Sequence, residues 1–519
     1  MKKILQHFNL YPTSKDCKTW LICFILLNCT FLYHTLNFMW GNHDVEFIKS
    51  RLSLNSGLFE GRFTQFIPYC LLTDGQILPI INNLLSFVFL TSALWLLAKY
   101  WRLPQNTLTV VLFITFFTTL PFTLSWLYFS LNTISCFLWI FFIVLGLYLS
   151  AYTYKEKHKI ILSLFSILCF YLPLGGYPPI INTILVCLCA EITIAYTVNK
   201  TSAKEIIQIH KYTVFNILIA AVLFKLTLWY IQPDHVYNLE TTSLSQMPQK
   251  LLSVIKISFY QFVISLPYME KNYKLTLCAL SIISFLSALI NTTGTRQRLI
   301  VVFLIFITIL SASATTFLVI PHTEYVARID FYGLAFIYLF ALSLLLCQKT
   351  PIIRSIALIF MFILLPWNII NDYRAQKNWQ QGFNAELQIL DDISERVENH
   401  PQFNPENKYR FYQIGDISLR PNYYQNRYEY PEPFLLSLPY LAMWQGTNLI
   451  EFYSPFSFID KETPLLASDI TPEVYDFIME KAQPWPHENA VYINHDIILI
   501  IYNQAGLNDF RKKIIPLRQ

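Results

Sequence analysis

Charged side chains are scarce in this chain of 519 residues: 14% are Asp, Glu, Lys or Arg, whereas 54% are hydrophobic. Soluble globular proteins carry about 25% charged residues, so the composition excludes an ordinary soluble domain. Many apolar runs approach the ~20 residues that a membrane-spanning helix needs. The net charge is only +5 and no DNA- or RNA-binding motif is present, so nucleic acid is not an expected partner. The sequence predicts a mainly α, polytopic membrane protein.

Cysteine is absent after Cys347, and all ten cysteines except Cys70 lie in or beside apolar runs. In such runs cysteine behaves as a small hydrophobic residue, so the pattern excludes a disulfide scaffold and a zinc site. The first apolar run, Trp20 to Phe38, is followed by no small-x-small cleavage site. It is also too long for a typical signal peptide, so it is interpreted as a retained signal anchor. No convincing internal repeat is present.

About eleven runs are interpreted as membrane spans. They are residues 19–39, 77–98, 106–122, 131–153, 159–174, 178–197, 213–231, 275–292, 299–320, 331–348 and 353–370. The pair at 159–197 is interrupted by the sequence YLPLGGYPP. Glycine and proline at that depth indicate a turn or a break between two helices.

Basic residues concentrate in every second connection between these runs. They are Lys2, Lys3, Lys15, Lys18, Lys99, Arg102, Lys155, Lys157, Lys159, Lys200, Lys204, Lys211, Arg296, Arg298, Lys349 and Arg354. Cytoplasmic loops of membrane proteins carry an excess of Lys and Arg. We therefore expect a cytoplasmic N-terminus and, because the number of spans is odd, an extracytoplasmic C-terminal part.

Two domains are predicted: a transmembrane domain, 1–370, and a small extracytoplasmic α/β domain, 371–519. The composition becomes polar at this boundary. The segment NAELQILDDISERVENH places Leu387, Leu390, Ile393 and Val397 on one helical face. The segments KYRFYQIG and AVYINHDIILIIYN are rich in aromatic and β-branched residues and are predicted as strands.

The stretch MWGNHDVEFIKSRLSLNSGLFEGRF, Met39 to Phe63, places His43, Asp44 and Glu46 just outside the first span, ahead of Arg62. Most such charges are simply solvated surface. A carboxylate within hydrogen-bond reach can, however, take a proton from a sugar hydroxyl, and arginine binds phosphate oxygens through two hydrogen bonds. The cluster therefore suits glycosyl transfer from a lipid phosphate. It could equally bind a solute or a divalent cation, which Asp44 and Glu46 could hold.

The order of these features resembles a known family. The acidic motif is followed by GRF (Gly61 to Phe63), a span introduced by LPIINNLL, the break in LPLGGYPPIINTILVCLCAEI, YVARID with Arg328, and the tail motif YRFYQIGD. This order resembles the glucosyltransferases of bacterial and phage serotype conversion, which modify O-antigen. The resemblance covers the membrane domain well and the tail loosely.

The resemblance implies a GT-C type fold with its active site on the outer face of the bacterial cytoplasmic membrane. Such enzymes move a sugar, here expected to be glucose, from a polyprenyl-phosphate carrier to a glycan. They have no nucleotide-sugar domain, and this chain has no Rossmann-like glycine-rich segment. The expected partners are membrane lipids, the polyprenyl-phosphate-linked sugar and a glycan acceptor. No cofactor is firmly implied.

The resemblance also assigns roles to residues. The family usually shows adjacent aspartates after the first helix, where this chain has His43-Asp44-Val45-Glu46. By position Asp44 is the expected base and Glu46 the second candidate. Arg62 and Arg328 are expected to hold the carrier phosphate or to orient the carboxylates. The outer segments add three further substrate-binding candidates, which are His43, His322 and Glu324.

Three other classes stay open at this point. A transporter or flippase of a lipid-linked sugar would be expected to show paired repeats and ionisable residues near the membrane midplane. Neither feature is clear here, although Lys225, which is central in its span, keeps this class open. A glycan polymerase or ligase typically has a large outer loop between spans, whereas the large outer part here is C-terminal. In a purely structural scaffold the acidic cluster would be incidental.

Overall fold

The computed structural model describes residues 12–37, 39–41, 44–47, 50–127, 129–153, 158–233, 247–263, 271–315, 331–348, 350–415, 446–454, 457–458, 470–494 and 497–515. These residues form two compact units. With the gaps just given, unit 1 holds 12–37 and 51–374, and unit 2 holds 39–50 and 375–515. The predicted domain boundary after residue 370 stays a prediction.

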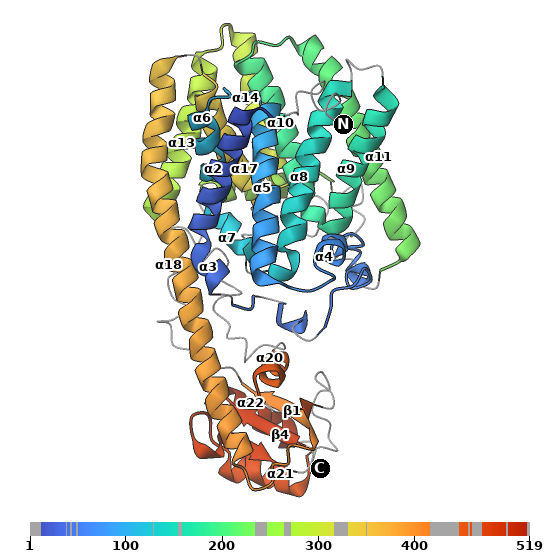
Figure 1. The fold of residues 1–519 in the computed structure, drawn as a ribbon, viewed down its shortest axis with the longest axis vertical. Helices are drawn as coiled ribbons and strands as arrows, with labels where there is room; N and C mark the ends of the chain where they lie inside the picture. Colours follow the sequence, from blue (N-terminus) through green and yellow to red (C-terminus); the bar gives the residue numbers. More distant parts are fainter. Residues whose placement is uncertain are drawn as a thin grey trace. The chain divides into compact units, whose positions relative to one another are not determined.

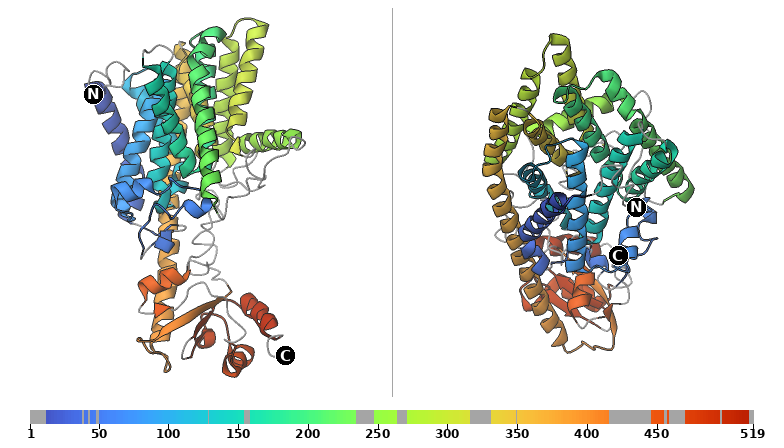
Figure 2. Two further views of the ribbon diagram at one scale, coloured as in Figure 1. Left: turned by 90° about the vertical axis from the view of Figure 1, so that its right-hand side faces the viewer. Right: turned by 45° about the horizontal axis from the view of Figure 1, so that its top comes forward.

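Unit 1 is a helical bundle in which most of the long helices run side by side (Figures 1 and 2). The helices are α2 (Ser14–Thr30), α3 (Leu32–Leu36), α4 (Ile67–Leu72), α5 (Pro79–Tyr100), α6 (Thr107–Thr118), α7 (Pro121–Leu127), α8 (Ser130–Thr153), α9 (Lys159–Gly176), α10 (Ile181–Thr197), α11 (Ala203–Ile231), α12 (Met247–Val263), α13 (Lys271–Ile290), α14 (Thr295–Ser311), α17 (Leu334–Leu346) and α18 (Pro351–Glu398). The last of these begins in unit 1 and continues into unit 2.

Local sequence signals explain where several helices begin. Thr13 and Asp16 form a capping box at the start of α2, in which each side chain satisfies a backbone amide of the first turn. Asn106 caps α6 and Ser202 caps α11 by accepting from amides three residues on. Pro79 begins α5, where its missing amide hydrogen costs nothing.

Every predicted span overlaps a helix of the described chain. Among the described residues, seven helices are long and apolar enough to cross a membrane, or eight if a bent pair counts as one span. The exact number of spans therefore stays a prediction. The bent pair covers the predicted span at 106–122, which consists of two helices rather than one straight helix. Here α6 and α7 meet at an angle of 57°, because Pro121 disfavours helical backbone at the preceding residue.

Two helix ends also differ from the predicted spans. The helix α11 begins at Ala203 rather than at 213, because the Ser202 cap starts a helix in a stretch too polar for a hydropathy window. The helix α18 continues through Pro366 to Glu398 rather than ending near 370. The change of composition after 370 is therefore not a helix break.

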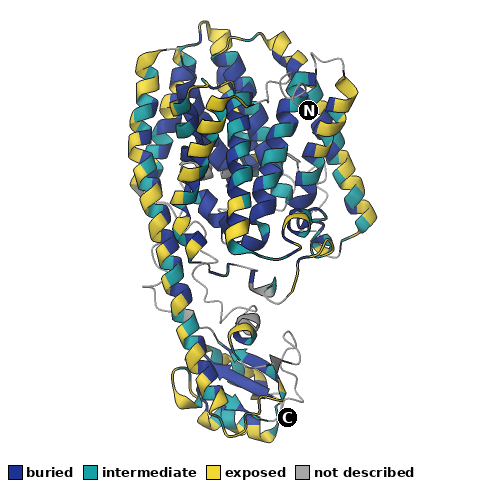
Figure 3. Cartoon of the chain, in the orientation of Figure 1, coloured by how far each residue is buried: buried dark blue, intermediate teal, exposed yellow. Residues whose placement is uncertain are grey.

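The interior of unit 1 is formed by helices that are covered on every side. All thirteen residues of α17 are buried, which explains why this helix is apolar around its whole circumference. In contrast α11 and α18 expose much of their surface (Figure 3). The exposed face of α11 carries large apolar side chains such as Phe215, Leu218 and Leu226. Such a face is what a lipid-contacting helix requires.

The basic connections gather at one end of unit 1, here called the basic end, which carries Lys15, Arg102, Lys200, Arg298 and Arg354. Hydrogen bonds link neighbouring connections there: the Lys15 ammonium donates to the Gln105 carbonyl at 3.1 Å, and Lys200 donates to the Asn291 carbonyl at 2.8 Å. The helices α2, α9 and α14 begin at this end, opposite α3 and α4 (Figure 1). The alternation of charge predicted that these connections share one side. Which side of the membrane they face stays a prediction.

Unit 2 contains a four-stranded sheet in the order β2-β1-β4-β3. Its elements are η1 (Asp44–Phe47), β1 (Lys408–Ile414), α20 (Gly446–Tyr453), β2 (Ser457–Phe458), α21 (Pro472–Asp476), η7 (Phe477–Lys481), η8 (Glu488–Ala490), β3 (Val491–Ile493), β4 (Ile497–Ile501) and α22 (Gln504–Ile514). The strand β1 lies parallel to β2 and β4, whereas β3 pairs with β4 antiparallel.

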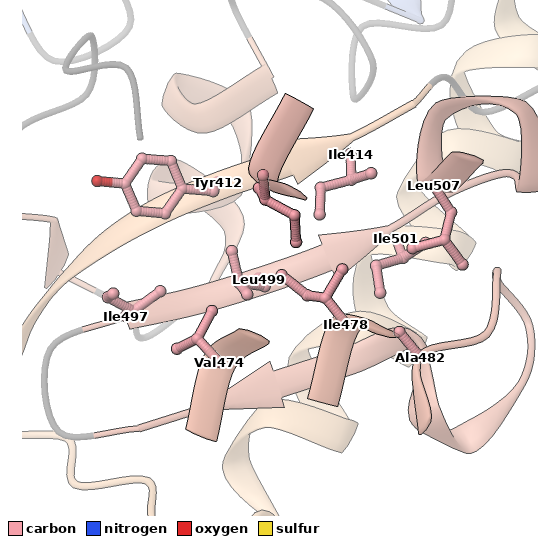
Figure 4. Close-up of a cluster of buried hydrophobic side chains, with 10 residues drawn as sticks. Tyr412, Ile414, Val474, Ile478, Ala482, Ile497, Leu499, Ile501 and Leu507 are labelled. Atoms are coloured by element: carbon pink, nitrogen blue, oxygen red, sulfur yellow. The ribbon is translucent and has the colours of Figure 1, made fainter. Parts of the chain in front are cut away.

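The two predicted strand segments contain β1, β3 and β4, but the second segment forms a hairpin rather than one strand. All five residues of β4, IILII, are buried, as expected of a strand covered on both faces. Figure 4 shows the cluster on one face, where Leu499 and Ile501 of β4 pack with Ile478 and Leu507. Leu390, Ile393 and Val397 of α18 are fully buried, in agreement with the predicted helical face.

Candidate functional site

Arg62 directly follows a tight turn in unit 1. The short helix η2 (Leu58–Glu60) ends at Gly61, whose φ of +74° lies in the left-handed region. The Gly61 amide donates to the Leu58 carbonyl and the Arg62 amide to the Gly57 carbonyl, both at 2.9 Å. Because glycine adopts a positive φ without a Cβ clash, the Gly-Arg pair fixes where the Arg62 side chain begins.

The Arg62 guanidinium has a carboxylate on one side and an aromatic ring on the other. Its Nη1 lies 2.8 Å from Glu60 Oε2, and the two side chains are 20% and 23% exposed. Its Cζ lies 5.3 Å from the centroid of the Tyr177 ring, within the range of a cation–π interaction. The guanidinium is thus oriented but still reachable, and its planar donors suit an oxyanion such as phosphate.

Tyr177 lies in the break that the sequence predicts between two helices. Here α9 ends at Gly176, Tyr177 is extended, and Pro178 begins the short helix η3 (Pro178–Ile180) that leads into α10. The segment that follows Arg62 is bonded to this break. The Thr64 amide donates to the Gly175 carbonyl at 3.1 Å, and the Thr64 hydroxyl donates to the Leu172 carbonyl at 2.6 Å. The break and the Arg62 turn therefore form one structure.

Two glycines allow this close approach. A Cβ at Gly175 would lie 2.5 Å from two ring carbons of Phe63, and a Cβ at Gly176 would lie 2.3 Å from Nε1 of Trp139. Real Cβ atoms do not come so close to other heavy atoms. The double glycine in the predicted break is thus explained by two contacts: Gly175 faces Phe63, the residue next to Arg62, and Gly176 faces Trp139 of α8.

Behind Tyr177 lie two buried aromatic side chains, Trp126 of α7 and Tyr332. The ring centroids of Trp126, Tyr177 and Tyr332 are 5.3 to 5.4 Å apart in each pair, the spacing at which aromatic rings attract one another. The Tyr332 hydroxyl donates to Cys136 Sγ at 2.9 Å. These three residues form the aromatic cluster. It supports the ring against which Arg62 packs.

The aromatic cluster and Glu60 were not among the predicted site residues. The break sequence GGYPP signals that Tyr177 occupies an unusual place. Trp126 and Tyr332 carry no such signal, because they come from distant parts of a chain with 42 Phe, 32 Tyr and 11 Trp.

Asp44, the predicted base, belongs to unit 2 and begins η1. Its side chain is fully buried. Its Oδ2 accepts a hydrogen bond from the Gly41 amide at 2.9 Å, while the Asp44 amide donates to the Gly41 carbonyl at 3.2 Å. The reciprocal pair holds the carboxylate in one orientation. A ligand can reach this buried carboxylate only if the surrounding residues move.

Aromatic side chains lie close to Asp44 in the same unit. Trp40 Nε1 donates to the Tyr453 hydroxyl at 3.2 Å, and the Trp40 ring lies 6.0 Å from that of Phe452, edge to face. Phe452 and Tyr453 are both about 40% exposed (42% and 41%). Burial raises the pKa of the Tyr453 hydroxyl from its usual range, so this hydroxyl stays protonated at neutral pH.

The other predicted site residues lie outside the described residues or are described only in part. His43, His322, Glu324 and Arg328 fall in the gaps of the structure, and Glu46 is described only as part of the η1 backbone. Their assigned roles stay predictions. Among the residues that the structure describes, no three His, Cys, Asp or Glu side chains come together as a metal site.

Comparison with known proteins identifies the family. A family model described as Glucosyl transferase GtrII matches residues 42–346, which is more than half of the chain. The matched region begins just before Asp44 and includes Arg62, the break at Tyr177 and the aromatic cluster. Neither the curated proteins nor the solved structures gave a match. The chain therefore belongs to the GtrII glucosyl transferase family and is a membrane glucosyltransferase.

Proposed function

We propose that the chain transfers glucose from a polyprenyl-phosphate carrier to a cell-surface glycan such as O-antigen, at the outer face of the bacterial cytoplasmic membrane. The observation that carries this proposal is the Arg62 guanidinium, oriented by Glu60 and Tyr177 yet still about one fifth exposed. It lies at the end of unit 1 opposite the basic end, because α9 begins there with Lys159 and ends here at Gly176. By the positive-inside rule the Arg62 end is extracytoplasmic.

In this proposal Arg62 binds the phosphate of the carrier. Its charge-assisted hydrogen bonds strengthen as the phosphate oxygen of the breaking bond gains negative charge, so they favour the transition state over the bound donor. Arg328 is proposed as a second cation for the same phosphate. The leaving group is already a stable phosphate, so no general acid is needed.

Asp44 is proposed as the base, with Glu46 as the second candidate. It takes the proton of an acceptor hydroxyl as the hydroxyl oxygen bonds to the anomeric carbon of glucose and the bond from that carbon to the carrier phosphate breaks. A single direct displacement inverts the anomeric centre. His43, His322 and Glu324 are proposed to bind the sugars.

The test uses purified full-length protein in detergent with radiolabelled polyprenyl-phosphate glucose and an acceptor glycan. We expect release of polyprenyl phosphate together with an added hexose on the glycan. Asp44→Asn should abolish both, whereas Asp74→Asn should leave both unchanged. Asp74 is a suitable matched control, because it lies in the same predicted outer segment and its side chain is 78% exposed.

Each failure has a separate meaning. If Asp44→Asn still transfers glucose, Asp44 is not the base and Glu46 takes its place in the proposal. If the wild type moves labelled carrier across a vesicle membrane without releasing polyprenyl phosphate, the flippase interpretation replaces the transferase. If the product is an extended or ligated glycan rather than one added hexose, the enzyme is a polymerase or ligase.

A further inference from the structure

A cavity of about 690 Å³ lies at the basic end of unit 1, remote from Arg62. Residues of α2, α5, α8, α10 and α11 line it, among them Lys15, Tyr100 and Glu191, together with Arg102 from the turn after α5. Cavities of 300 to about 1,000 Å³ are typical of sites for small molecules. The transfer reaction proposed above uses none of these residues. We call this space the basic-end cavity.

Three cations and three carboxylates line the basic-end cavity, so its formal charge is balanced. They are Lys15, Lys99, Arg102, Asp16, Glu191 and Glu205. The carboxylates and the cations differ in how much of their hydrogen-bonding capacity other protein groups already use. A carboxylate that accepts bonds from several fixed donors cannot attract a cationic ligand strongly, whereas a cation with donors to spare can still bind an anion.

Two of the carboxylates are engaged by the protein. Glu191 is buried; its Oε2 lies 2.6 Å from Nε2 of His210 and its Oε1 lies 3.3 Å from Nη2 of Arg102. Asp16 Oδ2 accepts from the amide and the hydroxyl of Thr13, each at 2.9 Å. Glu205 is exposed at the start of α11. The interior of the cavity therefore has few carboxylate oxygens left to accept bonds.

The donors are less fully engaged. The Arg102 side chain is 43% exposed. Among the residues that the structure describes, its contact with Glu191 uses one of its three nitrogens, Nη2. The Lys15 ammonium gives one of its three hydrogens to the Gln105 carbonyl. Tyr100 lines the cavity and is only 4% exposed. Its buried hydroxyl has no hydrogen-bond partner among the residues described. Buried hydroxyls are normally bonded, so this one indicates a ligand.

The backbone holds Arg102 in an unusual conformation. Its φ is +55°, which a non-glycine residue adopts only when its surroundings enforce it. The preceding Trp101 is fully buried and its Nε1 donates to the Cys187 carbonyl of α10 at 3.0 Å. The Leu103 amide then returns to the Ala98 carbonyl at 2.9 Å. This turn directs the guanidinium to Glu191 at the cavity wall.

We infer that the basic-end cavity binds a phosphate-bearing ligand, with Arg102 and Lys15 as its cations and the Tyr100 hydroxyl as a further donor. Arginine offers two parallel hydrogen bonds to a phosphate. The phosphate could belong to the headgroup of a phospholipid at the membrane edge or to a soluble phosphate ester, since both present the same oxygens. The inference does not depend on the proposed transfer reaction.

The experiment measures binding to delipidated full-length protein in detergent by native mass spectrometry and by the shift in Tm. The probes are dioctanoyl phosphatidylglycerol, glycerol 3-phosphate and dioctanoylglycerol, which has the same chains but no phosphate. Binding of phosphatidylglycerol alone identifies a lipid headgroup as the occupant. Binding of glycerol 3-phosphate as well identifies a soluble ester as sufficient. Equal binding of dioctanoylglycerol would overturn the inference.

Three variants locate the binding. Arg102→Gln should weaken phosphate binding about tenfold or more, and Tyr100→Phe about threefold, as charged and neutral hydrogen bonds contribute to those extents. Arg298→Gln is the matched control: Arg298 lies at the same end, donates to the Thr292 carbonyl at 3.0 Å and does not line the cavity. Equal losses in Arg298→Gln would show general surface attraction and overturn the site. If Arg102→Gln does not fold, unchanged affinity in Tyr100→Phe alone overturns it.

Discussion

Replacing Gly175 by alanine tests whether the Arg62 turn and the helix break are one structure. The new Cβ would lie 2.5 Å from Cε2 and Cζ of Phe63 and 3.1 Å from its Cδ2. Carbon atoms attract each other best at about 3.5 to 4.0 Å, so the ring must move by roughly 1 Å. The rings of Tyr171 and Phe224, at 5.6 and 6.1 Å, limit that movement. The strain therefore passes to the Arg62 turn.

The magnitude follows from two opposing effects. Overpacking of a filled site costs about 1–3 kcal/mol. Alanine is better than glycine within a helix by about 0.5–1 kcal/mol, and Gly175 lies in the last turn of α9. The net loss of stability is therefore roughly 1–2 kcal/mol. Glucose transfer should fall as well, because Phe63 directly follows the arginine that we propose binds the carrier phosphate.

The assay is unfolding of the full-length protein in mixed micelles, followed by tryptophan fluorescence, in a double-mutant cycle with Phe63→Leu. Leucine lacks the ring atoms that the new Cβ meets, so Gly175→Ala should cost little in that background. We expect a coupling energy of about 1–2 kcal/mol between the two sites, well above the ~0.5 kcal/mol within which independent sites add. Additive effects would refute the argued contact. A destabilised Gly175→Ala variant with full transfer activity would instead separate this contact from the site.

Three further predictions concern other parts of the chain. Arg62→Gln should lower the rate of glucose transfer about tenfold or more, because a hydrogen bond to a charged group contributes about 1.5–3 kcal/mol. The control Arg51→Gln, at a side chain that is 61% exposed, should keep the wild-type rate. Equal rates for both variants would remove Arg62 from the proposal. Leu499→Ala in the fully buried β4 should destabilise the sheet by about 2–5 kcal/mol. The control Ile515→Ala, at a side chain that is 44% exposed, should destabilise it far less. Limited proteolysis of the full chain measures both effects, and equal resistance of the two variants to the protease would contradict the assignment of Leu499 to the core. Burial lowers the pKa of His400 below its usual 6.5, so the folded state disfavours the charged ring. The stability of the protein should therefore fall as the pH drops through 6.5. The difference in Tm between pH 7.5 and 5.5 should be smaller in His400→Gln than in the wild type, and an unchanged difference would count against this burial effect.

The helical bundle could be predicted because apolar runs and basic connections are local signals. The helices α5, α8 and α10 follow their predicted bounds within a few residues, and the double glycine in the break indicated where α9 ends. The bend at Pro121 and the extension of α11 to Ala203 were missed, because a hydropathy window averages over a single proline and over one amphipathic turn.

The sites could be predicted only where one segment contains the whole signal. The Gly-Arg pair marked Arg62, but its ring partner Tyr177 lies more than a hundred residues away. Glu191 is buried between Arg102 and His210, and a pairing between three separate elements has no signature in one sequence.

The burial of α17 has a consequence for how the protein is made. Its thirteen residues extend about 20 Å at 1.5 Å per residue, less than the ~30 Å of a bilayer's hydrocarbon core. A helix this short cannot reach water at both ends, so the backbone groups at one end must be satisfied by neighbouring protein. We therefore expect α17 to reach its final position only when the helices that cover it are present. In this segment neighbouring helices take the place that lipid takes around an exposed span.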